Sequence, residues 1–274
     1  MSSGLHTQPI SSLFFQRNDS TWFTWLGMAG VLINARGTIL LIDPLLTTVK
    51  SGSQPMSESG YKLLIPTPIE AEAIPSVDLV MYTHADDDHF GRMTAKTLAD
   101  RLGCSFLAPL PVARLLQEEG IGADHITIAK DFQTLYTGQT LIQITPALHN
   151  WQQENPWQRG DCCGYLVKTP DEVIWHPGDT RLIDELLTFK GVDVLFFDVA
   201  AVDSHLGPEG STRLAKSCGA KSMIAYHYGT FDLPPGSFGS FDPDDARPFL
   251  NGVPARFLRP NPGEILAVSD VIPR

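Results

Sequence analysis

Short hydrophobic runs separated by polar turns extend along most of this chain, and most are too short for long helices. Apolar and β-branched runs of this kind are typical of strands, whereas apolar residues repeated every three to four positions are typical of amphipathic helices. The pattern predicts strands at Trp22–Leu26, Gly30–Asn34, Thr38–Ile42, Val77–Thr83, Cys104–Ala108, Ile126–Ile128, Thr140–Pro146, Tyr165–Lys168, Glu172–Trp175, Val192–Val199, Lys221–Tyr226, Ala255–Leu258 and Ile265–Val268. It predicts helices at Met93–Leu102, Pro111–Glu119, Arg181–Phe189 and Pro208–Ser217.

These elements follow a similar order in the two halves of the chain, residues 1–145 and 146–274. Each half has strands first and strand–helix units afterwards, which favours two sheets with helices outside them. Residues 1–20 are polar and irregular and are predicted to be a flexible N-terminal arm, with a single domain over 21–274. Residues 47–75 are rich in Ser, Gly, Pro and Glu, which predicts a long loop or flap.

Composition limits the class of protein. The 274 residues are 43% hydrophobic and 19% charged, which is typical of a globular chain and excludes collagen and coiled coils. The net charge of −11 disfavours nucleic acid as a partner. Four cysteines are too few and too irregular for a disulfide framework, and no signal peptide or membrane span is evident. A cytoplasmic location is therefore expected.

Acidic and imidazole side chains gather where predicted strands end. Four of them fall within six residues directly after a buried strand, and three more follow other strands: His84, Asp86, Asp88, His89, His149, Asp179 and His227. Strand ends along one edge of a sheet converge on a single rim, so these side chains are expected to meet there. Nitrogen and oxygen donors suit a divalent metal, and seven exceed the roughly four that one zinc ion takes. Two ions are therefore expected.

The local spacing suggests how the donors divide. Residues two apart in an extended segment point to the same side, so His84 and Asp86 can bind one ion. A turn into the following helix then directs Asp88 and His89 to the second ion. Each ligating histidine needs an acceptor for its other ring nitrogen, and Asp43, Asp198 and Thr230 are the predicted suppliers.

The stretch HADDDH, from His84 to His89, resembles the H-x-H-x-D-H signature of the metallo-β-lactamase fold. Further segments resemble that family in the same order: TWLGMAGVLIN, TILLIDPLL, PALHNW, HPGDT and AYHYGTF. The branch that the chain resembles most holds the ascorbate-6-phosphate lactonase-like and N-acylphosphatidylethanolamine phospholipase D type hydrolases, and DSHLGPEG around His205 also resembles it. The resemblance covers residues 21–268.

The resemblance implies an α+β fold of the αββα type, with two mixed sheets and helices on the outer faces. It implies a first metal site of His84, Asp86 and His149 and a second of Asp88, His89 and His227, with Asp179 bridging. The implied cofactors are two divalent ions, manganese, zinc or iron, and the implied reaction is attack by a metal-bridging hydroxide on a small-molecule lactone or phosphodiester. Asp88, which would orient the hydroxide, and His227 are the predicted catalytic residues, and His176 and His205 are predicted substrate contacts.

Asp86 departs from the family motif, which has histidine at this position. A carboxylate makes the first site harder and favours manganese or iron over zinc. Two alternatives therefore stay open: an iron-based redox or oxygen-handling protein, and a non-catalytic binding protein with a degenerate metal site. Met28 is a second departure, because the lactonase-like branch often has histidine there.

Several site assignments have simpler structural alternatives. Asp179 could be the N-cap of a helix over residues 181–189, and His149 and His227 could be structural. The aromatic residues near the motifs are core or substrate-binding candidates: Trp151, Trp157, Tyr226 and Tyr228. Arg159 and Lys50 are the nearest basic candidates for contacting an anionic substrate, and a homo-oligomer is expected.

Overall fold

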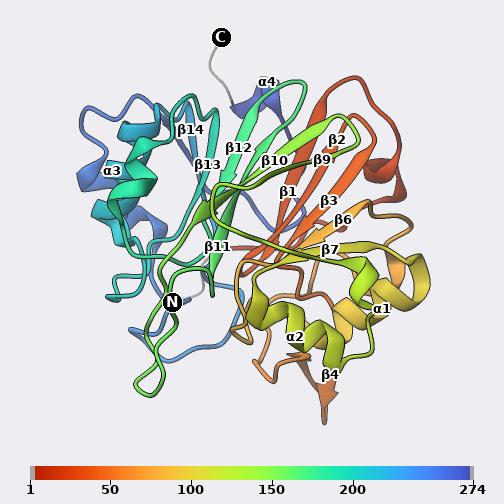
Figure 1. Ribbon diagram of the computed structural model, residues 1–274. Coiled ribbons are helices and arrows are strands. Elements are labelled where there is room, and N and C mark those ends of the chain that lie inside the picture. The colour runs from red at the N-terminus through yellow and green to blue at the C-terminus, as the bar shows by residue number, and fades with distance from the viewer. Residues whose placement is uncertain (1–3, 272–274) are drawn as a thin grey trace.

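Two seven-stranded sheets pack face to face in the computed structural model, which describes residues 4–271 (Figure 1). The first sheet has the order β16 (Leu266–Ala267), β1 (Thr21–Gly27), β2 (Gly30–Ala35), β3 (Thr38–Ile42), β6 (Leu79–Met81), β7 (Ser105–Ala108) and β8 (Ile126–Ile128). The second has the order β15 (Arg256–Leu258), β14 (Ser222–Ala225), β13 (Val194–Phe197), β12 (Val173–His176), β11 (Cys163–Lys168), β10 (Thr140–Pro146) and β9 (Thr134–Thr137).

Both sheets are mixed, as predicted. In the first, β16 to β3 pair antiparallel and β3 to β8 pair parallel. In the second, β9 to β12 pair antiparallel and β12 to β15 pair parallel. The similar order of elements in the two halves of the sequence thus corresponds to two similar sheets.

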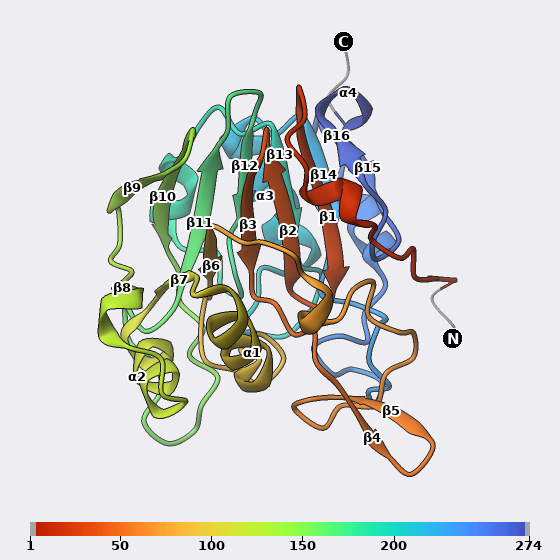
Figure 2. The same cartoon turned by 90° about the vertical axis from the view of Figure 1, so that its right-hand side faces the viewer.

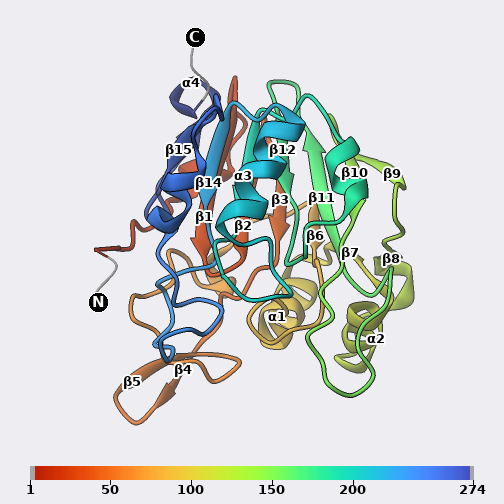
Figure 3. The same ribbon diagram turned by 90° about the vertical axis from the view of Figure 1, so that its left-hand side faces the viewer.

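Helices cover the outer faces and complete the αββα sandwich. The outer face of the first sheet carries α1 (Arg92–Leu102) and α2 (Leu110–Glu118), at its lower end in Figure 2. The second carries α3 (Gly207–Cys218), which lies in front of its strands in Figure 3. The remaining helical turns are η1 (Ser12–Phe15), η2 (Ala71–Ala73), η3 (Ala123–His125), η4 (Asp184–Thr188), η5 (Pro243–Phe249) and α4 (Val268–Val271).

Burial on both faces explains why the strand sequences are continuous apolar runs rather than alternating ones. In β3, Leu40 and Ile42 face the core between the sheets, whereas Ile39 and Leu41 pack under the outer layer. Side chains in a strand alternate between faces, so a strand covered on both sides needs apolar residues at every position.

Residues 4–20 pack on the sandwich and do not form the flexible arm that was predicted for them. Phe14 and Phe15 are buried in the cluster under the first sheet's outer layer. The buried Asn34 amide donates to the carbonyl oxygens of Phe14 and Gln16. Two phenylalanines in a short polar segment gave no helical or strand periodicity, so their burial was not predicted. Residues 1–3 of the predicted arm lie outside the described residues.

The predicted loop over residues 47–75 contains a β-hairpin, which projects at the bottom of Figure 2. Its strands are β4 (Thr48–Ser51) and β5 (Gln54–Ser57), joined by the two-residue turn Gly52-Ser53. Gly52 has a φ of +64°, which glycine adopts without strain in such turns. Four-residue strands that contain serine and proline have no strong hydrophobic pattern, which is why the hairpin was not predicted.

The structure differs from the prediction in two further elements. The strand β9 was not predicted, because its side chains are exposed or only half-buried. The helix predicted over Arg181–Phe189 is reduced to the 3₁₀ turn η4 (Asp184–Thr188). Tertiary contacts hold its first residues extended, since the Arg181 backbone N–H donates to Leu148 O at 2.9 Å.

Candidate metal centre

All seven predicted ligands lie together at one end of the sandwich. Four of them follow β6, and the other three follow β10, β12 and β14 (His149, Asp179 and His227). The ends of neighbouring strands bring residues that are far apart in sequence to the same rim, as the pattern predicted.

The first group of donors is formed by His84, Asp86 and His149. The Oδ2 atom of Asp86 lies 3.1 Å from Nε2 of His149 and 3.5 Å from Nε2 of His84. The two imidazole rings lie 5.0 Å apart, centroid to centroid. Both histidines are buried and Asp86 is partly exposed, so the group is open to solvent only on the carboxylate side.

The second group is formed by Asp88, His89 and His227. Nε2 of His227 lies 3.0 Å from Oδ2 of Asp88 and 3.0 Å from Nε2 of His89. Asp179 lies between the two groups: its Oδ2 is 3.3 Å from Nε2 of His89 and 3.5 Å from Nε2 of His227. It also lies with His84 and His89 in a set whose ligand atoms are all within 4.8 Å of one another. Its position suits a bridging ligand.

The electrostatics of these groups fit a divalent cation. Burial alone would lower the pKa of His89 and raise the pKa of Asp179. Opposite charges outweigh burial, so the pKa of His89 is held well above its usual value and the pKa of Asp179 well below. In addition, the buried atoms Nε2 of His84 and Oδ1 of Asp179 make no hydrogen bond within the described residues. Buried carboxylates together with an imidazole nitrogen that makes no hydrogen bond are a donor set for a metal ion.

Other residues fix the histidine rings. Nδ1 of His89 lies 2.8 Å from Oδ2 of Asp43, as predicted for Asp43. Nδ1 of His84 lies 2.9 Å from the Thr83 hydroxyl, and Nδ1 of His149 lies 3.0 Å from the Ser204 carbonyl oxygen. Sequence reasoning missed Thr83 and Ser204. Thr83 directly precedes the motif, so its hydroxyl could have been proposed as an acceptor. The Ser204 carbonyl belongs to a distant loop, and nothing in the sequence indicates its contact with His149.

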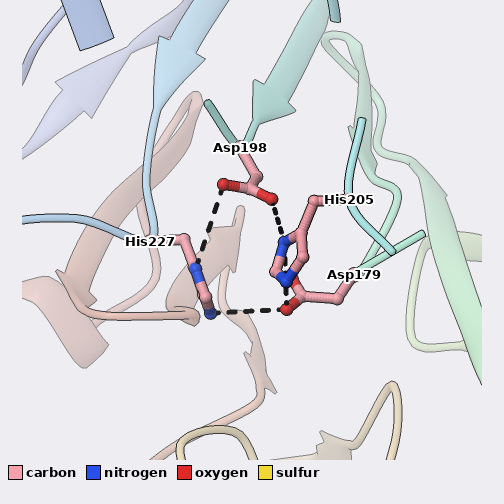
Figure 4. Close-up of side chains that lie close together, drawn as sticks. All are labelled: Asp179, Asp198, His205 and His227. Atoms are coloured by element: carbon pink, nitrogen blue, oxygen red, sulfur yellow. Dashed lines mark hydrogen bonds and ion pairs between the residues drawn. The ribbon is translucent and has the colours of Figure 1, made fainter. Parts of the chain in front are cut away.

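The predicted roles of Asp198 and Thr230 are different in the structure. Asp198 hydrogen-bonds to Nδ1 of His205, and its nearest approach to His227 Nδ1 is 3.9 Å (Figure 4). Thr230 accepts a hydrogen bond from the backbone N–H of Met28 at 3.1 Å. Neither therefore orients a ligand ring by a hydrogen bond.

His205 lies at the edge of the second group. Figure 4 shows its ring between Asp198 and Asp179, and its Nδ1 is 3.5 Å from Oδ2 of Asp179. Burial lowers the pKa of His205, but attraction from Asp198 and Asp179 outweighs it and raises the pKa to about 9. His205 also lines a cavity of about 550 Å³ that opens over the donors, so its predicted substrate contact is geometrically possible.

His176 does not lie in this cavity. It is fully buried, its Nε2 is 3.0 Å from the Ala29 carbonyl oxygen, and its Nδ1 accepts the Gly178 N–H at 3.3 Å. Both ring nitrogens are therefore satisfied by the backbone, and the predicted substrate contact is not supported.

Unusual backbone conformations position the loops around the donors. His227 has a φ of +64° and Met28 a φ of +42°, which are uncommon for residues other than glycine. The Met28 carbonyl oxygen accepts hydrogen bonds from the His227 N–H (2.9 Å) and from Trp25 Nε1 (2.7 Å). Beside Asp179, Gly178 has a φ of +67°, and an added Cβ would lie 2.7 Å from the Cys163 carbonyl oxygen. Only glycine fits there.

The structural alternatives for the site residues are also resolved in part. Asp179 caps no helix, because η4 begins at Asp184 with Ile183 as its N-cap. Tyr226 and Tyr228 are core residues. Trp151 is 55% exposed, lines the cavity and donates from Nε1 to Oδ2 of Asp86 at 2.8 Å.

Comparisons with known proteins agree with this geometry. Residues 38–228 match the family described as a β-lactamase superfamily domain. An N-acyl-phosphatidylethanolamine-hydrolyzing phospholipase D 1 from Caenorhabditis elegans is 24% identical, over 85% of this chain and 70% of that protein. A metal-dependent hydrolase of the UPF0173 group from Pyrococcus furiosus is 27% identical, over 89% of this chain and 97% of that protein.

Among solved structures, the metallo hydrolase Igni18 from Ignicoccus hospitalis has a similar fold, with a TM-score of 0.67 and 20% identity. The similarity covers 90% of this chain and 98% of Igni18. None of the helices within residues 4–271 combines the length and apolar character that crossing a membrane requires.

Proposed function

The chain is a metal-dependent hydrolase of the β-lactamase superfamily, and we propose that it uses two divalent ions to cleave a small-molecule lactone or phosphodiester. The observation that carries this proposal is the pair of donor groups joined by Asp179 at the floor of one cavity. His84, Asp86 and His149 would hold one ion and Asp88, His89 and His227 the other, with Asp179 between them. Manganese, zinc and iron are the candidate metals.

Two ions bound in this way would supply an acidified water and polarise the oxygen of the scissile group. The carboxylate of Asp88 lines the cavity and is held by His227 at 3.0 Å, so it can accept a proton from the attacking water. The water oxygen forms a bond to the carbonyl carbon or the phosphorus, and the bond to the leaving oxygen breaks.

His205 is the proposed contact for the leaving group. Its Nδ1 is engaged by Asp198, which leaves Nε2 as the ring nitrogen that can donate a hydrogen bond to a substrate oxygen. The leaving oxygen needs a proton when its bond breaks, and His205 is the histidine that lines the cavity without belonging to either donor group.

Elemental analysis of protein purified without added metal tests the proposal. We expect about two equivalents of manganese, zinc or iron per chain, and hydrolysis that a chelator abolishes and added metal restores. Bound iron together with oxygen consumption and no hydrolysis would favour the redox alternative, which Asp86 motivates. No metal after reconstitution would contradict the proposal and favour a binding protein with a degenerate site.

A further inference from the structure

The charge and shape of the cavity bear on which substrate it takes. We infer that the cavity selects an uncharged carboxylic ester or lactone with an apolar or aromatic group, and disfavours phosphodiesters and other anions. This inference rests on the proposed hydrolase function and narrows it to one substrate class. In the reaction, the water oxygen bonds to the carbonyl carbon and gives up a proton, the acyl–oxygen bond breaks, and the leaving oxygen takes up a proton, so that the products are a carboxylic acid and an alcohol group.

Carboxylates line the cavity, and within residues 4–271 no lysine or arginine does. Three of them, Asp86, Asp88 and Asp179, belong to the donor groups and would offset three of the four positive charges of two divalent ions. The fourth carboxylate, Asp87, also lines the cavity. It is exposed to solvent and belongs to neither donor group, so its negative charge adds to that of the three ligand carboxylates. His205 also lines the cavity, and the positive charge on its ring is paired with the buried Asp198 carboxylate, to which its Nδ1 is hydrogen-bonded. The site with its ions would therefore present little net positive charge to an approaching anion.

The basic residues next to the lining segments are already paired. Arg181 binds Asp203 at 2.9 Å and donates to the Asn150 side chain at 2.8 Å. Lys62, which follows the lining residue Tyr61, binds Asp232 at 2.6 Å. These cations would have to leave their partners to reach a substrate phosphate.

The two basic residues predicted to contact an anion are also placed elsewhere. Arg159 binds Glu185 at 3.0 Å and lies 3.4 Å from Asp131, and Lys50 lies on the projecting hairpin strand β4. Neither lines the cavity.

The helix that follows the HADDDH motif does not offer an anion site either. The N-terminus of α1 is occupied by the carboxylate of Glu58, which accepts hydrogen bonds from the backbone N–H groups of Met93 and Thr94. Helix N-termini commonly bind phosphate, but here a side chain of the chain itself fills that position.

Aromatic side chains from three separate segments contribute to the apolar part of the cavity: Tyr61, Trp151 and Phe238. Tyr61 stacks on Phe231, with ring centroids 4.9 Å apart, and meets Phe238 edge to face at 6.1 Å. Phe238 lies 5.6 Å from the His227 ring, so the apolar surface extends to the metal ligands. Such a wall contacts a hydrocarbon or aryl group favourably and gains nothing from a charged one.

Two esters that differ only in the terminal group of the acyl chain test this inference on the metal-loaded full chain. In para-nitrophenyl butyrate the acyl chain ends in a methyl group, and in para-nitrophenyl hemisuccinate it ends in a carboxylate. We expect kcat/KM to be at least about tenfold higher for the butyrate, and bis(para-nitrophenyl) phosphate to be hydrolysed more slowly than either. Equal rates, or preference for the hemisuccinate or the phosphate, would overturn the inference.

A charge reversal at the cavity supplies a second readout. Asp87→Lys should reduce the preference for the butyrate by about tenfold, whereas Asp124→Lys, the same change at a side chain that is 85% exposed in η3, should leave it unchanged. An unchanged ratio in Asp87→Lys would contradict the role of the lining charge.

Binding of two uncleaved amide analogues distinguishes failure of this inference from failure of the proposed function. If the metal-loaded protein hydrolyses none of the esters, the proposed function fails, and the amides butyranilide and succinanilate still report selectivity through Trp151 fluorescence. We expect butyranilide to bind at least about tenfold more tightly, with the signal lost in Trp151→Phe. Tighter binding of succinanilate would overturn the inference.

Discussion

Nδ1 of His89 lies 2.8 Å from Oδ2 of Asp43, and the same carboxylate accepts hydrogen bonds from the backbone N–H (2.7 Å) and hydroxyl (2.6 Å) of Thr83. With Nδ1 engaged in this way, Nε2 of His89 faces the second donor group. Asp43 therefore sets both the orientation of the ring and the nitrogen that is available to an ion.

Asp43→Asn should weaken metal binding at the second group by about tenfold to a hundredfold. The amide keeps the size of the side chain, and Asn tolerates the φ of +45° at this position, so the fold should persist. Metal affinity measured by competition with a chelator checks this. Asp78→Asn is the matched control, because Asp78 accepts the Ile39 N–H at 2.7 Å at the opposite end of β3. Equal affinities in both variants would contradict the role of Asp43.

His149→Ala and His227→Ala should remove different ions. His149 belongs to the first donor group and His227 to the second, so each variant should fall from about two to about one metal equivalent and lose turnover. Elemental analysis after dialysis provides the measurement. His125→Ala, at an exposed histidine in η3, should keep both ions. Full metal content in either site variant would show that the replaced histidine is not a ligand.

The sequence was most informative where strands lead into the site. The similar order of strands and helices in the two halves of the chain predicted two sheets, and the motif after β6 predicted the position of the donors, because strand patterns and their following loops are local properties of a sequence. Asp43 could also be proposed as one of three acceptors for the ligating histidines, and it follows β3, the strand that pairs with β6.

What could not be predicted depends on contacts between distant segments. His176 lies at the end of a strand, as the ligands do, and is followed by Pro177 and Gly178. Its ring nevertheless points into the core, where it contacts the Ala29 carbonyl oxygen. Glu58 and Trp151 lie in segments without periodicity, and only the fold brings Glu58 to α1 and Trp151 to Asp86. The ion pairs of Arg181 with Asp203 and of Lys62 with Asp232 likewise have no signature in the sequence.

Asp86→His should shift metal preference toward zinc. The Asp86 carboxylate is a harder ligand than imidazole, so replacing it with histidine should raise the ratio of zinc to manganese affinity by about tenfold. Asp87→His, one position along at the exposed carboxylate that belongs to neither donor group, is the control and should leave the ratio unchanged. Competition between the two metals at fixed protein concentration measures it. If Asp86→His behaves like the control, Asp86 does not bind metal.

Glu172 should make the fold less stable at high pH, independently of the metal centre. Its side chain lies 3% exposed, and neither carboxylate oxygen has a hydrogen-bond partner within the described residues. Burial, with added repulsion from Asp171 and Asp193, raises its pKa from 4.5 to about 8. The folded state therefore holds this proton more tightly than the unfolded chain does.

Because the pKa is raised on folding, the stabilising effect of the bound proton is complete below pH 4.5 and is lost as the pH rises through about 8. Glu172→Gln cannot ionise, so it should gain about 4 to 5 kcal/mol in unfolding free energy over the original chain between pH 4 and pH 9. Urea denaturation at the two pH values measures this difference, with Glu154→Gln as an exposed control that should follow the original chain. If Glu172→Gln changes stability equally at pH 4 and pH 9, the carboxyl does not titrate in this range, because a pH-independent difference reflects packing alone.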